Sequence, residues 1–183
     1  TAKSEPANLV KKIDNLNEMG WVVSTTDVGG NVISYEYYSD GLVKSALING
    51  NENTRIIVKY DNNRNRSYMR DPNYGSVSYF NDALGNITKV ITNNGNISEF
   101  EYDKSGRKVR CEEIDSKSNE KMVTSWIYDD NEGKKGTLKK VHNENHSIEY
   151  FYDDKLRLIT TKEIIDNVEY NTSYTYDEAN RIS

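Results

Sequence analysis

The length, composition and charge of the chain limit the kinds of protein that it can be. It has 183 residues, of which 35% are hydrophobic and 29% charged, with a net charge of -5 at pH 7. Its Lys and Arg residues are scattered rather than gathered into a basic stripe, which predicts no nucleic-acid partner. No apolar run approaches the ~18 residues of a membrane helix, so we expect no membrane insertion. The 14 Tyr residues favour β-strands and argue against disorder.

The first part of the chain admits two interpretations. Leu9, Ile13 and Leu16 have helical spacing, and Gly20 could follow the end of a helix. Alternatively, Gly20 closes a turn and residues 21–27 form a returning strand. Both interpretations remain open from the sequence, with residues 1–7 expected to be frayed.

From Leu16 onward the chain repeats a pattern of the form aromatic-x-Tyr-Asp-x-x-Gly. The clearest copy is Phe100-Glu101-Tyr102-Asp103-Lys104-Ser105-Gly106-Arg107. The tyrosine position recurs at 16, 37, 60, 81, 102, 128, 152 and 176, so successive spacings are 21, 23, 21, 21, 26, 24 and 24. The residues that carry the motif are Tyr37, Tyr60, Asp61, Asp82, Gly85, Tyr102, Asp103, Gly106, Arg107, Tyr128, Asp129, Tyr152, Asp153, Arg157, Tyr176, Asp177 and Arg181.

Each part of the motif has a physical reason. The aromatic-x-Tyr pair places two large side chains on one face of a strand, because side chains alternate along it. Asp then caps a tight turn, and Gly accepts the positive φ that closes it. Each repeat is thus two short strands and two turns. We predict an all-β fold in which tandem antiparallel β-hairpins form a curved, open meandering sheet of ~15 strands, since large open sheets curl.

We expect this array to be one domain over residues 1–183. Residues 1–15 are expected to be partly frayed or an incomplete repeat, and seven to eight repeats follow from 16 to 183. The longer spacings of the second half predict lengthened turns at residues 112–121 and 129–136.

The repeats resemble the YD-repeat, or Rhs, family. The segments that match its motif include Ser34-Tyr35-Glu36-Tyr37, Asp82-Ala83-Leu84-Gly85-Asn86-Ile87 and Tyr102-Asp103-Lys104-Ser105-Gly106-Arg107. Long arrays of this kind occur in Rhs proteins, in the BC components of Tc insecticidal toxins and in teneurins, where they form hollow β-shells. The resemblance implies a slice of a shell wall or a small relative on a bacterial surface. The chain stops within a repeat at residues 181–183, which favours the slice.

Other candidates for chemistry are weak. His142 and His146 have a spacing that could hold a metal on a helix, but they fall in a turn between repeats. Residues 129–133 gather acidic side chains without a calcium-loop pattern, so we expect an expanded, solvated turn. Cys111 is expected to be a small buried or half-buried residue of a strand. We therefore predict no catalytic residue, no metal and no cofactor.

The aromatic residues carry the remaining alternatives. We expect them to stack across neighbouring repeats, and an uncovered aromatic face could also bind a ligand. The possible ligand-binding aromatics are Tyr35, Phe100, Trp126, Tyr150 and Tyr174.

The function that follows is a non-enzymatic structural element: a segment of a Rhs-type shell or a surface repeat protein, secreted or at the bacterial cell surface. The alternative is a module that binds a glycan or protein through its aromatic face or variable turns. The expected partners are the rest of a larger parent chain, or a second copy through the sheet edges.

Overall fold

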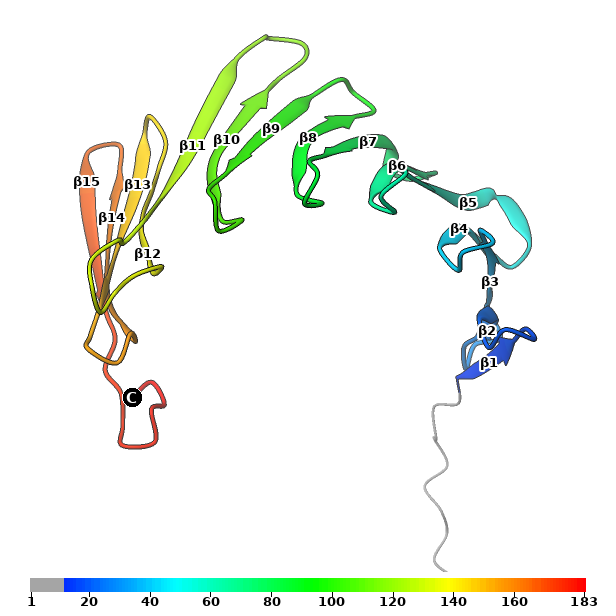
Figure 1. Cartoon of the computed structure of the whole chain (residues 1–183), viewed down its shortest axis with the longest axis horizontal. Helices are drawn as coiled ribbons and strands as arrows, with labels where there is room; N and C mark the ends of the chain where they lie inside the picture. Colours follow the sequence, from blue (N-terminus) through cyan, green and yellow to red (C-terminus); the bar gives the residue numbers. More distant parts are fainter. Residues whose placement is uncertain (1–11) are drawn as a thin grey trace, which may run out of the picture. The chain divides into compact units, whose positions relative to one another are not determined.

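The fold is all-β. The computed structural model describes residues 12–183, and in them 15 strands follow one another along the chain (Figure 1). The strands are β1 (Ile13–Leu16), β2 (Val22–Thr26), β3 (Val32–Tyr37), β4 (Val43–Ile48), β5 (Asn51–Tyr60), β6 (Arg66–Asp71), β7 (Gly75–Asn81), β8 (Ile87–Thr92), β9 (Ile97–Tyr102), β10 (Lys108–Ile114), β11 (Lys121–Tyr128), β12 (Leu138–His142), β13 (His146–Tyr152), β14 (Leu158–Ile165) and β15 (Val168–Ser173). Residues 1–7 and Leu9, which carry part of the predictions for the first segment, lie outside the described residues.

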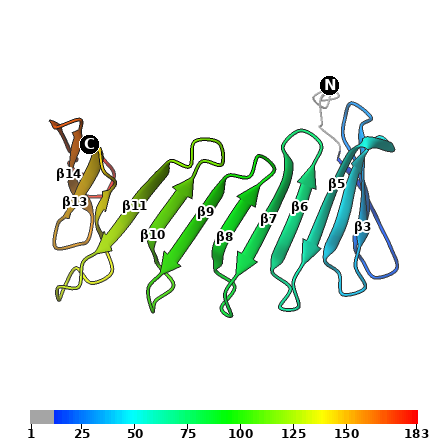
Figure 2. The same ribbon diagram turned by 90° about the horizontal axis from the view of Figure 1, so that it is seen from above.

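The strands are ordered in the sheet as they are in the sequence. Within β1–β7 and within β8–β15 each strand pairs antiparallel with the next, and the strand order is that of one meandering sheet. The predicted fold class is therefore confirmed. The chain divides into two compact units, residues 1–85 with β1–β7 and residues 86–183 with β8–β15. Within the second unit, Figure 2 shows β8 to β11 as neighbouring hairpins with long, slanted strands.

The first described segment is a strand rather than a helix. Ile13 pairs with Thr26, and Asp14 pairs with Thr25. The helical interpretation is therefore wrong for residues 13–16, because the cross-strand ladder satisfies their backbone groups. Asn17 takes the place of the turn aspartate: its side-chain oxygen accepts hydrogen bonds from the backbone N–H groups of Met19 and Trp21 at 3.0 and 2.9 Å.

The two faces of the sheet differ in chemistry. In the second unit, Phe100 lies opposite Cys111 on one face, and Glu101 lies opposite Arg110 on the other. We call these the aromatic face and the charged face. Among residues 12–183 only Val58, Cys111 and Ser45 are buried, with 8%, 7% and 3% of their surface exposed. A single layer of strands leaves most side chains half-buried, so the fold lacks a conventional core in its described part.

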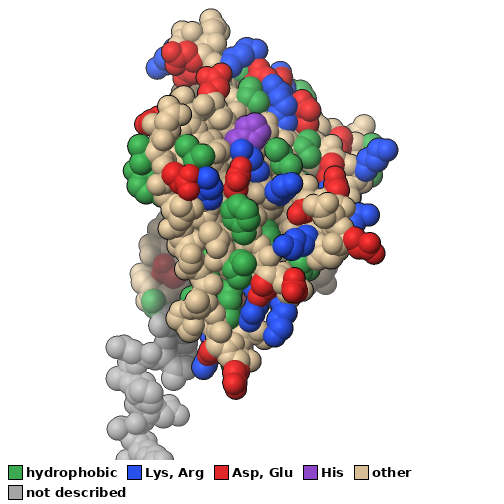
Figure 3. Space-filling model, turned by 90° about the vertical axis from the view of Figure 1, so that its left-hand side faces the viewer, with side chains coloured by type: hydrophobic (Ala, Val, Ile, Leu, Met, Phe, Trp, Pro, Cys, Tyr) green, Lys and Arg blue, Asp and Glu red, His purple; other side chains and the backbone are tan. Residues whose placement is uncertain are grey.

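Ion pairs run across the charged face. Glu99 pairs with Lys89 at 2.8 Å, Glu149 with Lys140 at 3.0 Å, and Glu169 with Lys162 at 2.7 Å. Arg110 joins Glu101 to Glu112, which also accepts a hydrogen bond from Lys121. Figure 3 shows a side of the molecule on which acidic and basic side chains are interspersed, with hydrophobic side chains among them. The charges of this face are thus largely matched by neighbours.

Candidate functional site

The Asp-x-x-Gly turn is a closed hydrogen-bonded frame. Oδ1 of Asp103 accepts hydrogen bonds from the backbone N–H groups of Ser105 and Arg107 at 2.8 and 2.9 Å. Oδ2 accepts a hydrogen bond from Nε of Arg107 at 2.7 Å. The N–H of Gly106 donates to the carbonyl of Asp103 at 3.0 Å, and the ladder shifts register just beyond, between Lys108 and Arg110. This is the pattern of a type I turn that is followed by a residue with positive φ and a bulge.

The same frame recurs at Asp153 and Asp177. Asp153 accepts hydrogen bonds from the backbone N–H groups of Lys155 and Arg157, both at 2.9 Å, and from Nε of Arg157 at 2.7 Å. Asp177 binds Arg181 in the same way, with Nε at 2.8 Å. Sequence spacing alone therefore identified turns that share one geometry.

These hydrogen bonds lower the pKa of the aspartates. The backbone N–H of Arg107 lowers the pKa of Asp103 most, and the backbone N–H of Arg157 does the same for the pKa of Asp153. Partial desolvation opposes both shifts, and the guanidinium groups reinforce them. The pKa of Asp177 is lowered by the backbone N–H of Arg181 and then by its side chain. Hydrogen bonds to a carboxylate favour its charged form, so these turns are built around ionised aspartates.

The turn arginine also reaches the next repeat. The guanidinium carbon of Arg107 lies 4.2 Å from the ring centre of Tyr128, and that of Arg157 lies 4.6 Å from the ring centre of Tyr176. A guanidinium over an aromatic face is attracted by the ring. The aspartate thus fixes the arginine, and the arginine contacts the tyrosine of the following repeat.

The repeat tyrosines complete the link through their hydroxyl groups. In five repeats the hydroxyl donates a hydrogen bond to the carbonyl of the residue two positions after the positive-φ residue that closes the preceding turn. The bonds are Tyr37 to Val22 (2.7 Å), Tyr102 to Ile87 (2.8 Å), Tyr128 to Lys108 (3.0 Å), Tyr152 to Leu138 (2.9 Å) and Tyr176 to Leu158 (2.8 Å). The sequence pattern did not predict this link, because the separation along the chain between the tyrosine and its acceptor varies from 14 to 20 residues.

Departures from the motif show what the link requires. Asn81 stands where other repeats have Tyr, and its side-chain amide donates to the carbonyl of Arg66 at 3.0 Å. Tyr60 packs edge-on against Tyr38 at 6.1 Å between ring centres, and the hydroxyl of Tyr38 bonds the carbonyl of Val58. Trp21 takes the place of the arginine and packs on Tyr37. A donor of suitable reach, rather than a tyrosine as such, therefore meets the requirement.

The expected stacking of aromatic rings from repeat to repeat is wrong at several junctions. Tyrosines of successive repeats are separated by a returning strand, so their rings stand about 10 Å apart. A cation fills the space instead: Arg107 lies over Tyr128, and Nζ of Lys108 lies 4.3 Å from the ring centre of Phe100 and 5.5 Å from that of Trp126. Two of the possible ligand-binding aromatics, Phe100 and Trp126, thus already hold a cation of their own chain.

The other possible ligand-binding aromatics are partly exposed. Tyr35, Tyr150 and Tyr174 are half-buried on the sheet, and no described contact assigns them a ligand. Their role in binding stays a prediction.

The cysteine, the two histidines and the acidic turn at Asp129 lie where the fold alone accounts for them. Cys111 is buried, and this burial raises the pKa of its thiol, with the nearby Glu113 adding to the shift. His142 and His146 lie on opposite faces of the sheet, because His142 pairs with Ser147 and side chains alternate. His146 contacts Glu163, with 2.7 Å between Nε2 and Oε1. Asp129 accepts the N–H of Asn131 in an expanded turn.

No cluster of three or more metal-ligating side chains occurs in the part of the chain that the structure describes. Within the same residues, no helix is long and apolar enough to span a membrane.

Comparison with known proteins supports the fold. No protein-family model and no curated protein matches the chain. Among solved structures, the chain resembles the Photorhabdus luminescens Tc holotoxin pore carrying a TccC3 mutation, with a TM-score of 0.54 and 16% identity over 94% of this chain. It also resembles the TcdB2-TccC3 complex, with a TM-score of 0.55 and 15% identity over 97% of this chain. In both cases it spans only 9% of the matched chain. The chain therefore has the fold of a segment of the YD-repeat (Rhs) shell of Tc toxins.

Proposed function

We propose that the chain is a non-enzymatic structural repeat element, a segment of a secreted or cell-surface bacterial protein with a Rhs-type wall. The observation that carries this proposal is the link between successive repeats. Each linking hydroxyl or amide bonds the backbone of the repeat before it, as Tyr128 does with Lys108 and Asn81 with Arg66. Such a link stabilises an array by joining neighbours, as in other repeat proteins.

The exposed edge of the sheet at β15 favours a partner whose strand would extend the sheet. All six residues of β15 are exposed, and Val168 and Tyr170 keep 51% and 54% of their surface accessible. An exposed edge strand presents unpaired backbone groups that bind another strand. We infer that the edge pairs with another part of a longer parent chain or, in the isolated chain, with a second copy.

Analytical ultracentrifugation tests this proposal. The isolated 183-residue chain should associate with increasing concentration, and the pair of substitutions Val168→Lys and Tyr170→Lys should abolish association, because charged residues protect an edge. The matched control is Val28→Lys with Tyr74→Lys, which adds the same charges at exposed residues of the β2–β3 and β6–β7 turns. A strictly monomeric wild-type chain, or equal effects of both pairs, would contradict the proposal.

The alternative of a glycan-binding module has its own test. Nζ of Lys108 lies near the ring centres of both Phe100 and Trp126, so a sugar that stacks on the same ring faces competes with this cation. On a glycan array, we expect the wild-type chain and Trp126→Ala to give the same result. Binding that is lost on Trp126→Ala, with the chain still folded, would support the alternative instead.

A further inference from the structure

A shallow trough crosses the hairpins at one end of the strands in the second unit. It has a volume of about 930 Å³ and is lined by residues of four successive hairpins, which lie between 92 and 98, 113 and 122, 143 and 146, and at 165–166. These are the turns between repeats, at the opposite end of the strands from the Asp-x-x-Gly turns. The trough is thus a surface made by the array rather than by any one repeat.

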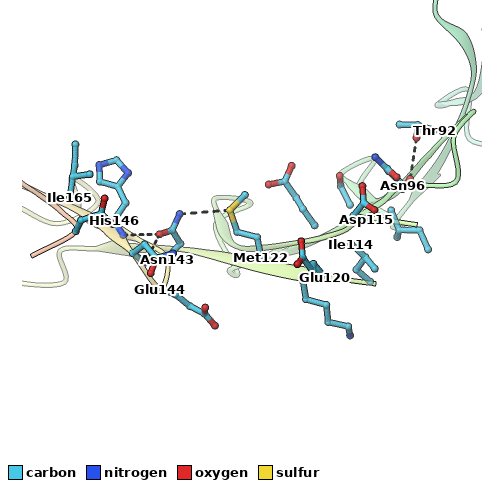
Figure 4. Close-up of a pocket in the computed structure, with 16 residues that line it drawn as sticks. Thr92, Asn96, Ile114, Asp115, Glu120, Met122, Asn143, Glu144, His146 and Ile165 are labelled. Carbon is cyan, nitrogen blue, oxygen red and sulfur yellow. Dashed lines mark hydrogen bonds between the residues drawn. The ribbon is translucent and has the colours of Figure 1, made fainter. Parts of the chain in front are cut away.

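The floor of the trough continues the aromatic face. Met122 lies opposite Glu113, and Ile165 lies opposite His146. Met122 and Ile165 keep 48% and 42% of their surface exposed. Figure 4 shows Met122 between Asn143 on one side and Ile114 and Glu120 on the other. Methionine adapts its shape to different contacts, so this floor suits an apolar side chain of a partner.

The charges of the trough are unbalanced, unlike those of the charged face. Glu113, Glu120, Glu144 and Asp166 contribute to the trough, and none of them takes part in an ion pair among residues 12–183. The one lysine of the trough, Lys121, directs its ammonium group to Glu112 on the charged face at 2.8 Å.

The histidine of the trough does not balance these acids, because it contacts an acid of its own. His146 contacts Glu163. On the charged face, by contrast, the acidic side chains form ion pairs with Lys89, Arg110, Lys140 and Lys162. The trough therefore combines an apolar floor with unpaired negative charge.

We propose that this trough binds an extended, basic segment of a partner protein. It crosses about seven strand spacings of ~4.8 Å, which is the length of roughly ten residues of extended polypeptide. It is too open to enclose a small molecule, since small-molecule sites bury most of their ligand. Lysine or arginine side chains of the segment pair with the acidic rim, and apolar side chains between them contact Met122 and Ile165.

Peptide binding in the trough and the proposed structural role do not depend on each other. A purely structural segment needs no ligand in the trough, and association through the β15 edge places the partner elsewhere. Failure of peptide binding would leave the edge proposal intact, and failure of edge association would leave the trough proposal intact.

Fluorescence anisotropy with a defined probe tests the proposal on the full chain. The probe is a labelled peptide of about nine residues that alternates lysine and leucine, and a peptide that alternates glutamate and leucine is its counterpart. The lysine peptide should bind, with an affinity that falls as salt increases, and the glutamate peptide should not.

Matched variants locate the binding. The pair Glu113→Lys and Glu144→Lys should weaken binding of the lysine peptide about tenfold or more, since it places like charges against the probe. The pair Asp154→Lys and Glu178→Lys changes the net charge equally, at exposed residues of the opposite turns, and should change binding less than about twofold. The milder pair Glu113→Gln and Glu144→Gln should weaken binding by a smaller factor. Equal losses in the two lysine pairs, or no binding of the lysine peptide to the wild-type chain, would overturn the proposal.

Discussion

Two turns of the second unit, at Asp103 and at Asp153, share the aspartate that begins the turn and the arginine that follows it, but they differ at the three residues between, including the residue at positive φ. Both aspartates accept two backbone N–H groups and one arginine Nε at distances that agree within 0.1 Å. At the residue that requires positive φ, the first turn has Gly106 at 76° and the second has Leu156 at 61°. The comparison shows that the aspartate frame imposes the backbone conformation even where the residue disfavours it.

Removal of the turn aspartate should reduce stability by different amounts in the two turns. Asp153→Ala removes the acceptor of two backbone N–H groups and of Arg157, so that only backbone hydrogen bonds, such as that of the Leu156 N–H to the carbonyl of residue 153, still hold Leu156 in its unfavourable conformation. We expect the largest loss of stability of all the substitutions considered, and a larger loss than for Asp103→Ala, where Gly106 needs no support. Urea unfolding compares the two, and an equal loss would show that the frame does not restrain Leu156.

Exchanging the residues at positive φ isolates the backbone contribution. Leu156→Gly should raise the free energy of unfolding by about 1 kcal/mol, because the left-handed conformation costs an L-residue about 1–2 kcal/mol. Gly106→Leu should lower it by a similar amount, and the space around Gly106 admits a Cβ without contact. Thermal or urea unfolding measures both. Changes of the same sign in the two variants would refute this account of the turn.

The arginine contacts allow a finer comparison. Arg107→Lys and Arg157→Lys keep the charge but lose the planar group that lies over Tyr128 and Tyr176 and binds the aspartate. Each should lower the free energy of unfolding by about 0.5–1 kcal/mol. The loss should be somewhat larger for Arg107, whose guanidinium lies closer to its tyrosine. If lysine proved equivalent to arginine at both positions, the planar contact would contribute nothing.

The turns also predict a dependence on pH. The folded-state pKa of Asp103, Asp153 and Asp177 is lower than its unfolded value, so their ionised forms stabilise the fold above the unfolded pKa of about 3.9. This contribution should be constant at neutral pH and should decrease as the pH falls below about 4. Urea unfolding between pH 7 and pH 3 should show the decrease. Asp153→Asn should reduce it, whereas an unchanged profile in that variant would count against the assignment.

Most of the fold could be predicted from the sequence, because the motif recurs at spacings of 21 to 26 residues. Alternating aromatic residues and Asp-x-x-Gly turns predicted antiparallel hairpins, a strand count near the observed number and the pairing of Asp103 with its turn. Reading the motif could not show that Leu156, Arg64 and Asn180 adopt the positive φ of the missing glycine, since hydrogen bonds to the aspartate decide this.

The contacts between repeats were less predictable. The tyrosine ladder was expected to stack ring on ring, but the spacing across a returning strand leaves room for Arg107 and Lys108. Asn81 stands where other repeats have Tyr, and the motif did not show that its amide makes the same link to the repeat before it. Such links depend on side-chain reach in three dimensions, which residue spacing does not encode.

Side-chain links between repeats replace a conventional core in residues 12–183, and the loss of a single hydroxyl tests this most directly. Tyr128→Phe removes the hydrogen bond to the carbonyl of Lys108 and leaves the ring in place. Tyr170→Phe removes a hydroxyl from an exposed edge residue and is the matched control. Equilibrium urea unfolding should show a loss of about 1 kcal/mol for Tyr128→Phe and almost none for Tyr170→Phe. Indistinguishable losses in the two variants would contradict the claim.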